Sequence, residues 1–123
     1  MHPHILFAED DPDTRQMVQL LLRRSGFRVS APESAVDALT LAGQEHFDVV
    51  LLDNWMPDLS GIELCRQIRT FDQTTPILFC SGAVTQADKD EAVLVGAQGY
   101  VGKPFEPEEL IGALWAVLRK AET

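Results

Sequence analysis

Residues 48–53 of the chain read Asp-Val-Val-Leu-Leu-Asp, and this stretch decides the fold. Four consecutive apolar residues without polar alternation are typical of a strand that is covered on both faces, as in the centre of a parallel sheet. Parallel strands need a long crossover connection, which is usually a helix. We therefore predict an α/β fold with a central strand over residues 48–53.

Four more short apolar runs lie along the chain, at residues 4–8, 27–31, 76–81 and 99–102. Longer segments with a helical period follow each run, so the chain reads as five strand–helix pairs. This pattern predicts a doubly wound (βα)5 domain, with helices on both faces of a five-stranded parallel sheet. The chain has 123 residues, the usual size of one domain, so we expect residues 1–123 to form a single domain.

Capping residues mark the expected helix starts. Asp-Pro at residues 11–12 begins the first helix, and Pro-Glu at residues 32–33 is expected to open the second. Residues 60–63 and 85–88 resemble capping boxes at the third and fourth helices. One face of the first helix is expected to carry Met17, Leu20, Leu21 and Arg24.

Charge and length exclude several classes of protein. Nineteen acidic residues against ten Lys and Arg give a net charge of −9, the wrong sign for binding a phosphate backbone directly. The longest apolar runs, residues 49–52 and 113–118, are far shorter than the roughly 20 residues needed to cross a bilayer. Residues 1–3 do not begin a signal peptide. We expect a cytoplasmic protein that contacts neither nucleic acid nor membrane.

The cysteines and histidines do not suggest a reactive or zinc-binding site. Cys65 and Cys80 each lie within an apolar pattern and are expected to be buried free thiols. His2, His4 and His46 have no metal-ligand spacing.

Acidic residues follow two of the predicted strands. Glu9 and Asp10 follow the first strand and Asp53 follows the third, and parallel neighbours would bring them to the same edge of the sheet. Clustered carboxylates repel one another unless a cation lies between them. Oxygen ligands favour Mg²⁺, or Mn²⁺, over zinc. Asp11 and Asp13 are expected to cap the first helix and not to bind metal.

Two other strand ends offer complementary groups. Ser81 ends the fourth strand with a hydroxyl, and Lys103 follows the fifth strand with an ammonium. A carboxylate nucleophile, a divalent cation, a lysine and a hydroxyl at one point can accept a phosphoryl group and stabilise its oxygens.

The chain resembles the receiver domain of two-component response regulators, the family of chemotaxis regulators. The stretches that carry this resemblance are residues 5–15, 51–61, 80–83 and 99–105. They occur in the family's order and spacing, and the resemblance extends from about residue 5 to residue 118. It implies a strand order of 2-1-3-4-5.

The resemblance also implies a role for each site residue. Asp53 would accept a phosphoryl group from a sensor histidine kinase or a histidine phosphotransfer protein, and Lys103 would contact the phosphoryl oxygens. The implied Mg²⁺ ligands are Glu9, Asp10, Asp53 and the main-chain carbonyl of Trp55. Ser81 would turn toward the phosphate and Tyr100 would turn inward behind it. The Lys103–Pro104 bond would be cis.

The last helix is apolar on nearly all sides over residues 110–118, whereas an outer helix needs only one buried stripe. Leu94 and Val95 could extend the same patch. We expect the helix that begins near residue 85, the strand 99–102 and the last helix to form a contact surface for a homodimer or an effector. Alternatively, Trp115 covers the edge of the core.

A phosphohydrolase and a nucleotide carrier are the alternatives to a regulatory switch. A metal-dependent phosphohydrolase with an aspartyl nucleophile would need a second acid two residues after Asp53, where this chain has Trp55. A flavodoxin-like nucleotide carrier would need a glycine-rich or hydroxyl-rich loop after the first strand, where residues 9–11 are acidic. We expect a regulatory phospho-acceptor and not an enzyme, in which the bulky Trp55 shields the acyl phosphate from water.

Overall fold

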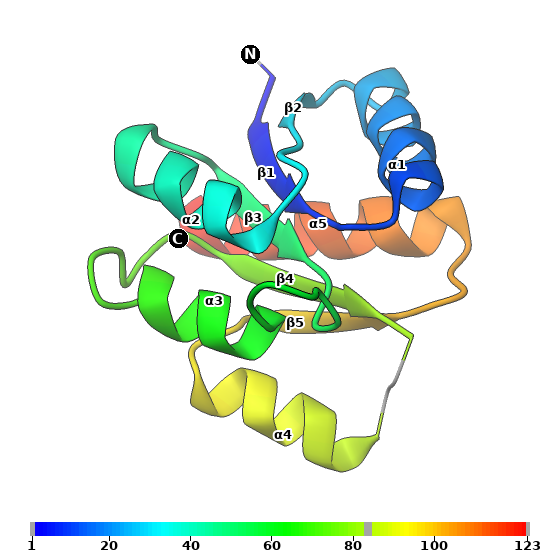
Figure 1. Ribbon diagram of the computed structural model, residues 1–123. Helices are drawn as coiled ribbons and strands as arrows, with labels where there is room; N and C mark the ends of the chain where they lie inside the picture. The colour runs from blue at the N-terminus through cyan, green and yellow to red at the C-terminus, as the bar shows by residue number, and fades with distance from the viewer. Residues whose placement is uncertain (1, 83–84, 123) are drawn as a thin grey trace.

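The computed structural model describes residues 2–82 and 85–122. The strands are β1 (His4–Ala8), β2 (Arg28–Ser30), β3 (Val49–Leu52), β4 (Ile77–Ser81) and β5 (Gly99–Gly102). The helices are α1 (Pro12–Arg24), α2 (Ala35–Gln44), α3 (Gly61–Ile68), α4 (Gln86–Leu94) and α5 (Pro107–Glu122). All paired strands are parallel, and their order is β2-β1-β3-β4-β5, which confirms the predicted (βα)5 fold (Figure 1).

The central strand β3 lies between β1 and β4, and all four of its residues are buried. Successive side chains of a strand point to opposite faces of the sheet. Val50 and Leu52 pack with residues of α2, α3 and α4, whereas Val49 and Leu51 pack with residues of α1 and α5. Figure 1 shows these two helical layers on either side of the sheet. The strand is apolar throughout because both of its faces are covered.

Capping side chains start three helices where the sequence predicts. Asp11, Ser60 and Thr85 cap α1, α3 and α4, and each side chain accepts a hydrogen bond from the backbone N–H three residues further on. The predicted start of α2 at residues 32–33 was wrong. This helix begins after Ser34, whose hydroxyl accepts a hydrogen bond that a proline side chain cannot accept.

The buried face of α1 also differs from the predicted one. Val18 and Leu22 are buried. The exposed residues of the predicted face include Met17, at 60%, and Leu20, at 52%. Arg15 lies on the same side as Val18 and Leu22, and its Nη1 donates to the Glu9 carbonyl at 2.9 Å. α1 carries two neighbouring apolar stripes, and this contact with the turn that precedes the helix helps to select the one that faces inward.

Within the described part of the chain, no helix combines the length and the apolar character that crossing a membrane requires.

His4 joins three strands at the amino edge of the sheet. Its backbone N–H donates to Asp48 Oδ2 at 2.7 Å, and its Nε2 lies 2.8 Å from the Ser30 hydroxyl. The ring packs against Phe47, with 4.6 Å between the ring centroids. Burial lowers the pKa of His4, and the positive charge of Arg28 lowers it further. The folded state therefore favours the neutral imidazole.

This arrangement predicts that acid weakens the fold through His4. The unfolded chain takes up a proton near the ordinary pKa of 6.5, whereas folded His4 takes it up only at lower pH. The stabilisation by neutral His4 is thus complete above about pH 6.5 and is lost as the pH falls toward the lowered value. Urea unfolding in steps from about pH 7.5 to pH 5 measures it.

His4→Gln should flatten this part of the pH profile, because glutamine does not titrate. His46→Gln is the matched control, since His46 is exposed, and it should leave the slope due to His4 in place. An identical pH slope in wild type and His4→Gln would contradict the prediction.

Candidate functional site

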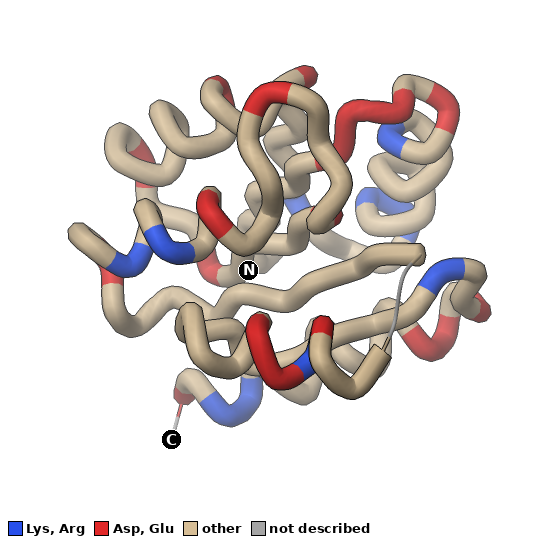
Figure 2. Tube along the Cα trace, turned by 60° about the horizontal axis from the view of Figure 1, so that its bottom comes forward, with Lys and Arg blue, Asp and Glu red and all other residues tan. Residues whose placement is uncertain are grey.

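Three carboxylates meet at the carboxyl edge of the sheet. Glu9 and Asp10 follow β1, and Asp53 follows β3. Ala8 pairs with Leu52 across these strands, and the Asp53 N–H donates to the Ala8 carbonyl at 3.1 Å. One oxygen of each carboxylate lies within 4.8 Å of the others. Figure 2 shows the acidic stretch where β1 leads into α1. The residues predicted as acidic ligands therefore form one cluster.

Lys103 reaches this cluster from β5, beyond the end of β4. Its N–H donates to the Ser81 carbonyl at 2.9 Å, which fixes its backbone beside β4. Its ammonium donates to Glu9 Oε1 and lies 3.3 Å from Asp53 Oδ2. The Lys103–Pro104 bond is cis, as expected. Four predicted site residues thus converge from three strands.

Burial and neighbouring charges shift the pKa values of Glu9 and Lys103 in opposite directions. Burial raises the pKa of the Glu9 carboxyl, while its hydrogen bond from Lys103 works in the other direction. Burial alone would lower the pKa of Lys103, but the hydrogen bond to Glu9 and the charge of Asp53 reverse this effect, so the pKa is raised. Lys103 therefore stays positively charged at neutral pH. The cluster holds three carboxyl groups beside a single ammonium within the described residues.

Ser81 and Tyr100 lie next to this cluster, on β4 and β5. Ser81 is fully buried, and its hydroxyl has no hydrogen-bond partner within the described residues. Tyr100 is half-buried and stacks on Phe79, with 5.6 Å between ring centroids and 6° between ring planes. Burial raises the pKa of the Tyr100 phenol. Ala83, which belongs to the stretch that suggested the family, lies outside the described residues.

The loop after β3, residues 53–61, is closed at its base by Asn54, a residue that the sequence analysis did not single out. The Gly61 N–H donates to the Asn54 carbonyl at 3.0 Å, and the Ile62 N–H donates to Asn54 Oδ1 at 3.1 Å. The Trp55 N–H donates to Asp53 Oδ1 at 3.2 Å. Asn54 is buried, and a second polar residue immediately after Asp53 at the end of a buried strand was the signal that could have identified it.

Arg15 organises the acidic turn and was also missed. Its Nη1 donates to the carbonyls of Glu9, at 2.9 Å, and Asp10, at 3.3 Å. Asp11 N–H donates to Glu9 Oε2 at 3.3 Å within the same turn. A cation in the first turn of a helix is unusual, because that end of the helix is positive, and its position there was the available signal.

Comparison with known proteins agrees with this geometry. The sequence profile of the response regulator receiver domain matches residues 5–115. The chain belongs to the response regulator receiver domain family. This receiver domain is 36% identical over 120 residues to the uncharacterized transcriptional regulatory protein YkoG of Bacillus subtilis, an alignment that covers 98% of the chain and 53% of YkoG. It spans about half the length of the curated relatives it matches.

Solved receiver structures share its fold. Chemotaxis protein CheY4 of Vibrio cholerae superimposes with a TM-score of 0.91 at 33% identity, covering 95% of this chain and 99% of that one. The receiver domain of sensor histidine kinase PA1611 from Pseudomonas aeruginosa has a TM-score of 0.89 at 27% identity, covering 97% and 99%. That structure holds a magnesium ion in its active site cleft.

The close approach of Gly61 to the end of β3 predicts a sensitive position. In Gly61→Ala, the added methyl would lie 2.5 Å from the Asp53 carbonyl oxygen and 2.9 Å from Leu52 Cδ1. The loop must shift to admit it, so we expect a loss of about 1–3 kcal/mol in the free energy of unfolding, measured with urea.

Gly112→Ala in α5 is the control, because no atom lies within 4 Å of its added methyl. Alanine there should stabilise the protein by about 0.5–1 kcal/mol, since it lowers the entropy of the unfolded chain. A Gly61→Ala variant as stable as wild type would show that the loop yields without cost.

Proposed function

We propose that this receiver domain is a phosphorylation-dependent switch, in which Asp53 takes a phosphoryl group from a phosphohistidine on a sensor histidine kinase or a histidine phosphotransfer protein. The observation that carries the proposal is the convergence of Glu9, Asp10, Asp53 and Lys103 at one sheet edge. We also propose that residues 1–123 act as one receiver domain and that it works in the cytoplasm.

The acidic cluster suits Mg²⁺, for which Mn²⁺ could substitute. The residues that would hold the ion are Glu9, Asp10, Asp53 and, through its main-chain carbonyl, Trp55. Carboxylate oxygens that lie within 4.8 Å of one another offer the hard oxygen ligands that Mg²⁺ prefers. When bound, the ion would neutralise negative charge on the phosphoryl oxygens.

In the transfer, a carboxylate oxygen of Asp53 forms a bond to phosphorus while the phosphorus–nitrogen bond of the donor breaks. The bonding electrons stay on the donor imidazole, which takes up a proton from water. Lys103 already contacts Asp53, so its ammonium can bind an oxygen of the transferred phosphoryl group. The product is an acyl phosphate on Asp53.

The switch would begin at Ser81. Its buried hydroxyl, which lacks a partner among the described residues, would donate a hydrogen bond to the phosphoryl group. Tyr100 would then turn inward, and its movement would shift β5 and α4. A phosphoryl group that accepts this hydrogen bond from Ser81 would stabilise the conformation with Tyr100 turned inward. Phosphorylation would thereby shift the population from one conformation to the other.

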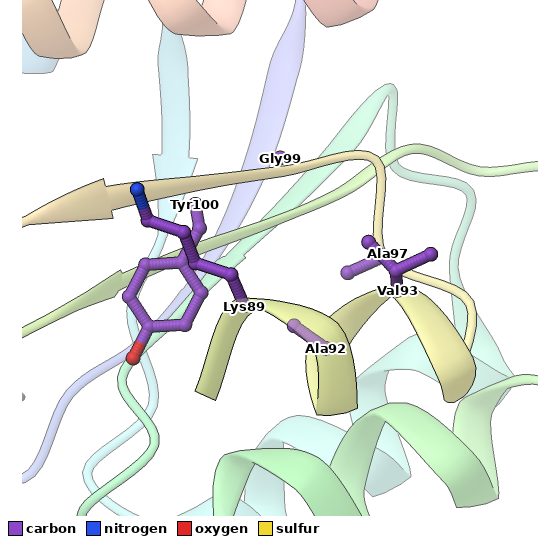
Figure 3. A pocket seen from close by; sticks show the side chains of 6 residues that line it. All are labelled: Lys89, Ala92, Val93, Ala97, Gly99 and Tyr100. Carbon is purple, nitrogen blue, oxygen red and sulfur yellow. The ribbon is translucent and has the colours of Figure 1, made fainter. Parts of the chain in front are cut away.

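The α4–β5 side offers a contact surface that this shift could alter. A cavity of about 220 Å³ lies there, shown in Figure 3 and lined by Lys89, Ala92, Val93, Ala97, Gly99 and Tyr100. Val93 and Leu94 are exposed by 68% and 85%. We propose that a homodimer partner or an effector binds on this side. Tyr100 both lines the cavity and lies beside Ser81 and Asp53, so it connects the surface to the site.

The last helix contributes less exposed apolar surface than its sequence suggested. Leu110, Leu114 and Val117 are buried in the core. Trp115 packs on Phe27, with 5.1 Å between ring centroids, and so covers the edge of the core. The exposed apolar residues of the proposed contact surface therefore come from α4.

Incubation with Mg²⁺ and a small acyl phosphate donor tests the proposed function. We expect one stable phosphoryl group per chain on wild type and none on Asp53→Ala, measured by intact mass. Asp13→Ala is the matched control, because Asp13 is also an acidic residue near the edge but is exposed and outside the cluster. Labelling of Asp53→Ala would refute Asp53 as the acceptor.

The same experiment separates the switch from a phosphohydrolase. A switch holds its phosphoryl group after one turnover, whereas a hydrolase releases phosphate over many turnovers. Fast multiple-turnover release of phosphate by wild type would favour the hydrolase.

Trp55 is expected to slow the loss of the phosphoryl group. Trp55 is 62% exposed, and its backbone N–H donates to Asp53 Oδ1, so its apolar side chain starts directly beside the proposed acceptor. Trp55→Asn replaces this apolar cover with a group that can hold water, and the acyl phosphate should decay severalfold faster. The decay of phosphorylated protein after donor removal measures it. Trp115→Phe, far along the chain on α5, should leave the decay unchanged, and equal decay in wild type and Trp55→Asn would overturn the prediction.

A further inference from the structure

Asp58 lies in the loop that follows the proposed acceptor Asp53, residues 54–60, which we call the acceptor loop. It connects this loop to a helix that the proposed reaction does not otherwise involve. Its carboxylate accepts hydrogen bonds from the N–H groups of Val36, at 2.9 Å, and Ala35, at 3.3 Å. These are the first two residues of α2, more than 20 residues earlier in the chain. The bonds hold the pKa of Asp58 below its ordinary value. Ser34 caps the same helix from within, by accepting from Asp37 N–H at 3.1 Å.

The helix that holds Asp58 is itself well fixed. Ala35 and Ala38 of α2 are completely buried and belong to the same core cluster as Leu52 and Met56. Because these two alanines are buried in the core, the start of α2 is a rigid attachment point for Asp58. The acceptor loop is thus anchored to an element outside itself.

The segment between Asp53 and Asp58 is consequently fixed at both ends. At one end, Asp53 is bonded through its N–H to β1, and Asn54 closes the base of the loop. At the other end, Asp58 is bonded to α2. Trp55, whose carbonyl is a proposed Mg²⁺ ligand, lies between these anchors. Because the segment is only a few residues long, movement of one anchor moves that carbonyl.

We propose that Asp58 is a positioning residue for the metal site, because its attachment to α2 holds the main-chain carbonyl of Trp55 where a cation at Glu9, Asp10 and Asp53 can use it. This inference rests on the proposed function and extends it to a residue outside the acidic cluster. The competing explanation is that Asp58 only stabilises α2. The two explanations differ in whether loss of Asp58 changes cation affinity or fold stability alone.

Mg²⁺ titration of the folded domain distinguishes them, read by the fluorescence of Trp55 in a Trp115→Phe background. Asp58→Ala should weaken Mg²⁺ binding about tenfold or more, as loss of a group that orients a metal ligand does. Asp58→Asn keeps one oxygen acceptor, which can serve the Val36 N–H, and should restore part of the affinity. Thermal unfolding of each variant without Mg²⁺ reports stability separately.

Ser34→Ala is the matched control, because it removes a cap from the same helix without touching the acceptor loop. It should lower thermal stability and leave Mg²⁺ affinity unchanged. Equal Mg²⁺ affinity in Asp58→Ala and wild type would overturn the proposal, and so would an equal loss in Ser34→Ala. If Asp58→Ala does not fold, Asp58→Glu replaces it, since the longer side chain keeps the charge but displaces the loop and should also weaken binding.

The outcome also separates this inference from the proposed function. If wild type binds Mg²⁺ and Asp10→Ala does not, the metal site stands, and the Asp58 variants alone decide the positioning role. If wild type does not bind Mg²⁺ at millimolar concentration, the metal site fails and the inference fails with it.

Discussion

The repulsion between carboxylates at one sheet edge is the constraint on which the rest of this structure depends. Glu9 and Asp53 are almost completely buried, where an unpaired negative charge is costly. The parallel pairing of β1 and β3 makes their proximity unavoidable, because both strands end at the same edge. Lys103 reduces the repulsion from two strands away, and the small side chain of Ser81 at the intervening strand end leaves room for it. The strand order therefore determines which charged side chains meet at the site.

Residues around this cluster fix backbone groups and do not add charge to it. Arg15 binds carbonyls of the acidic turn, and Asn54 binds N–H groups of the acceptor loop. Asp58 directs its charge away from the cluster, toward the N–H groups of α2. Asp58 joins segments more than 20 residues apart, whereas Arg15 and Asn54 bond backbone groups in nearby turns. The site thus has an inner group of ionisable residues and an outer group that determines where the backbone lies.

The architecture and the positions of the inner group of ionisable residues could be predicted from the sequence. An unbroken apolar strand, five strand–helix pairs and carboxylates at two strand ends follow from local patterns, and parallel topology brings them together. Asp58 could not be predicted, because it acts through backbone atoms of a segment more than 20 residues earlier in the chain, which no local pattern reveals. The prediction of the buried face of α1 was wrong because the sequence pattern alone does not determine which face is covered. Among two neighbouring apolar stripes, only tertiary contacts decide which one meets the sheet.

The sparse attachment of α4 has a consequence for how the domain communicates. Among its described residues only Ala92 is buried, while Asp88, Lys89, Asp90 and Glu91 remain in contact with solvent. Elements with few buried contacts open at a small fraction of the global unfolding free energy. Such a helix can detach and reseat while the sheet stays intact, so the proposed switch need not loosen the hydrophobic core. The helix that opens most easily, α4, would then also be the helix that moves in the proposed switch.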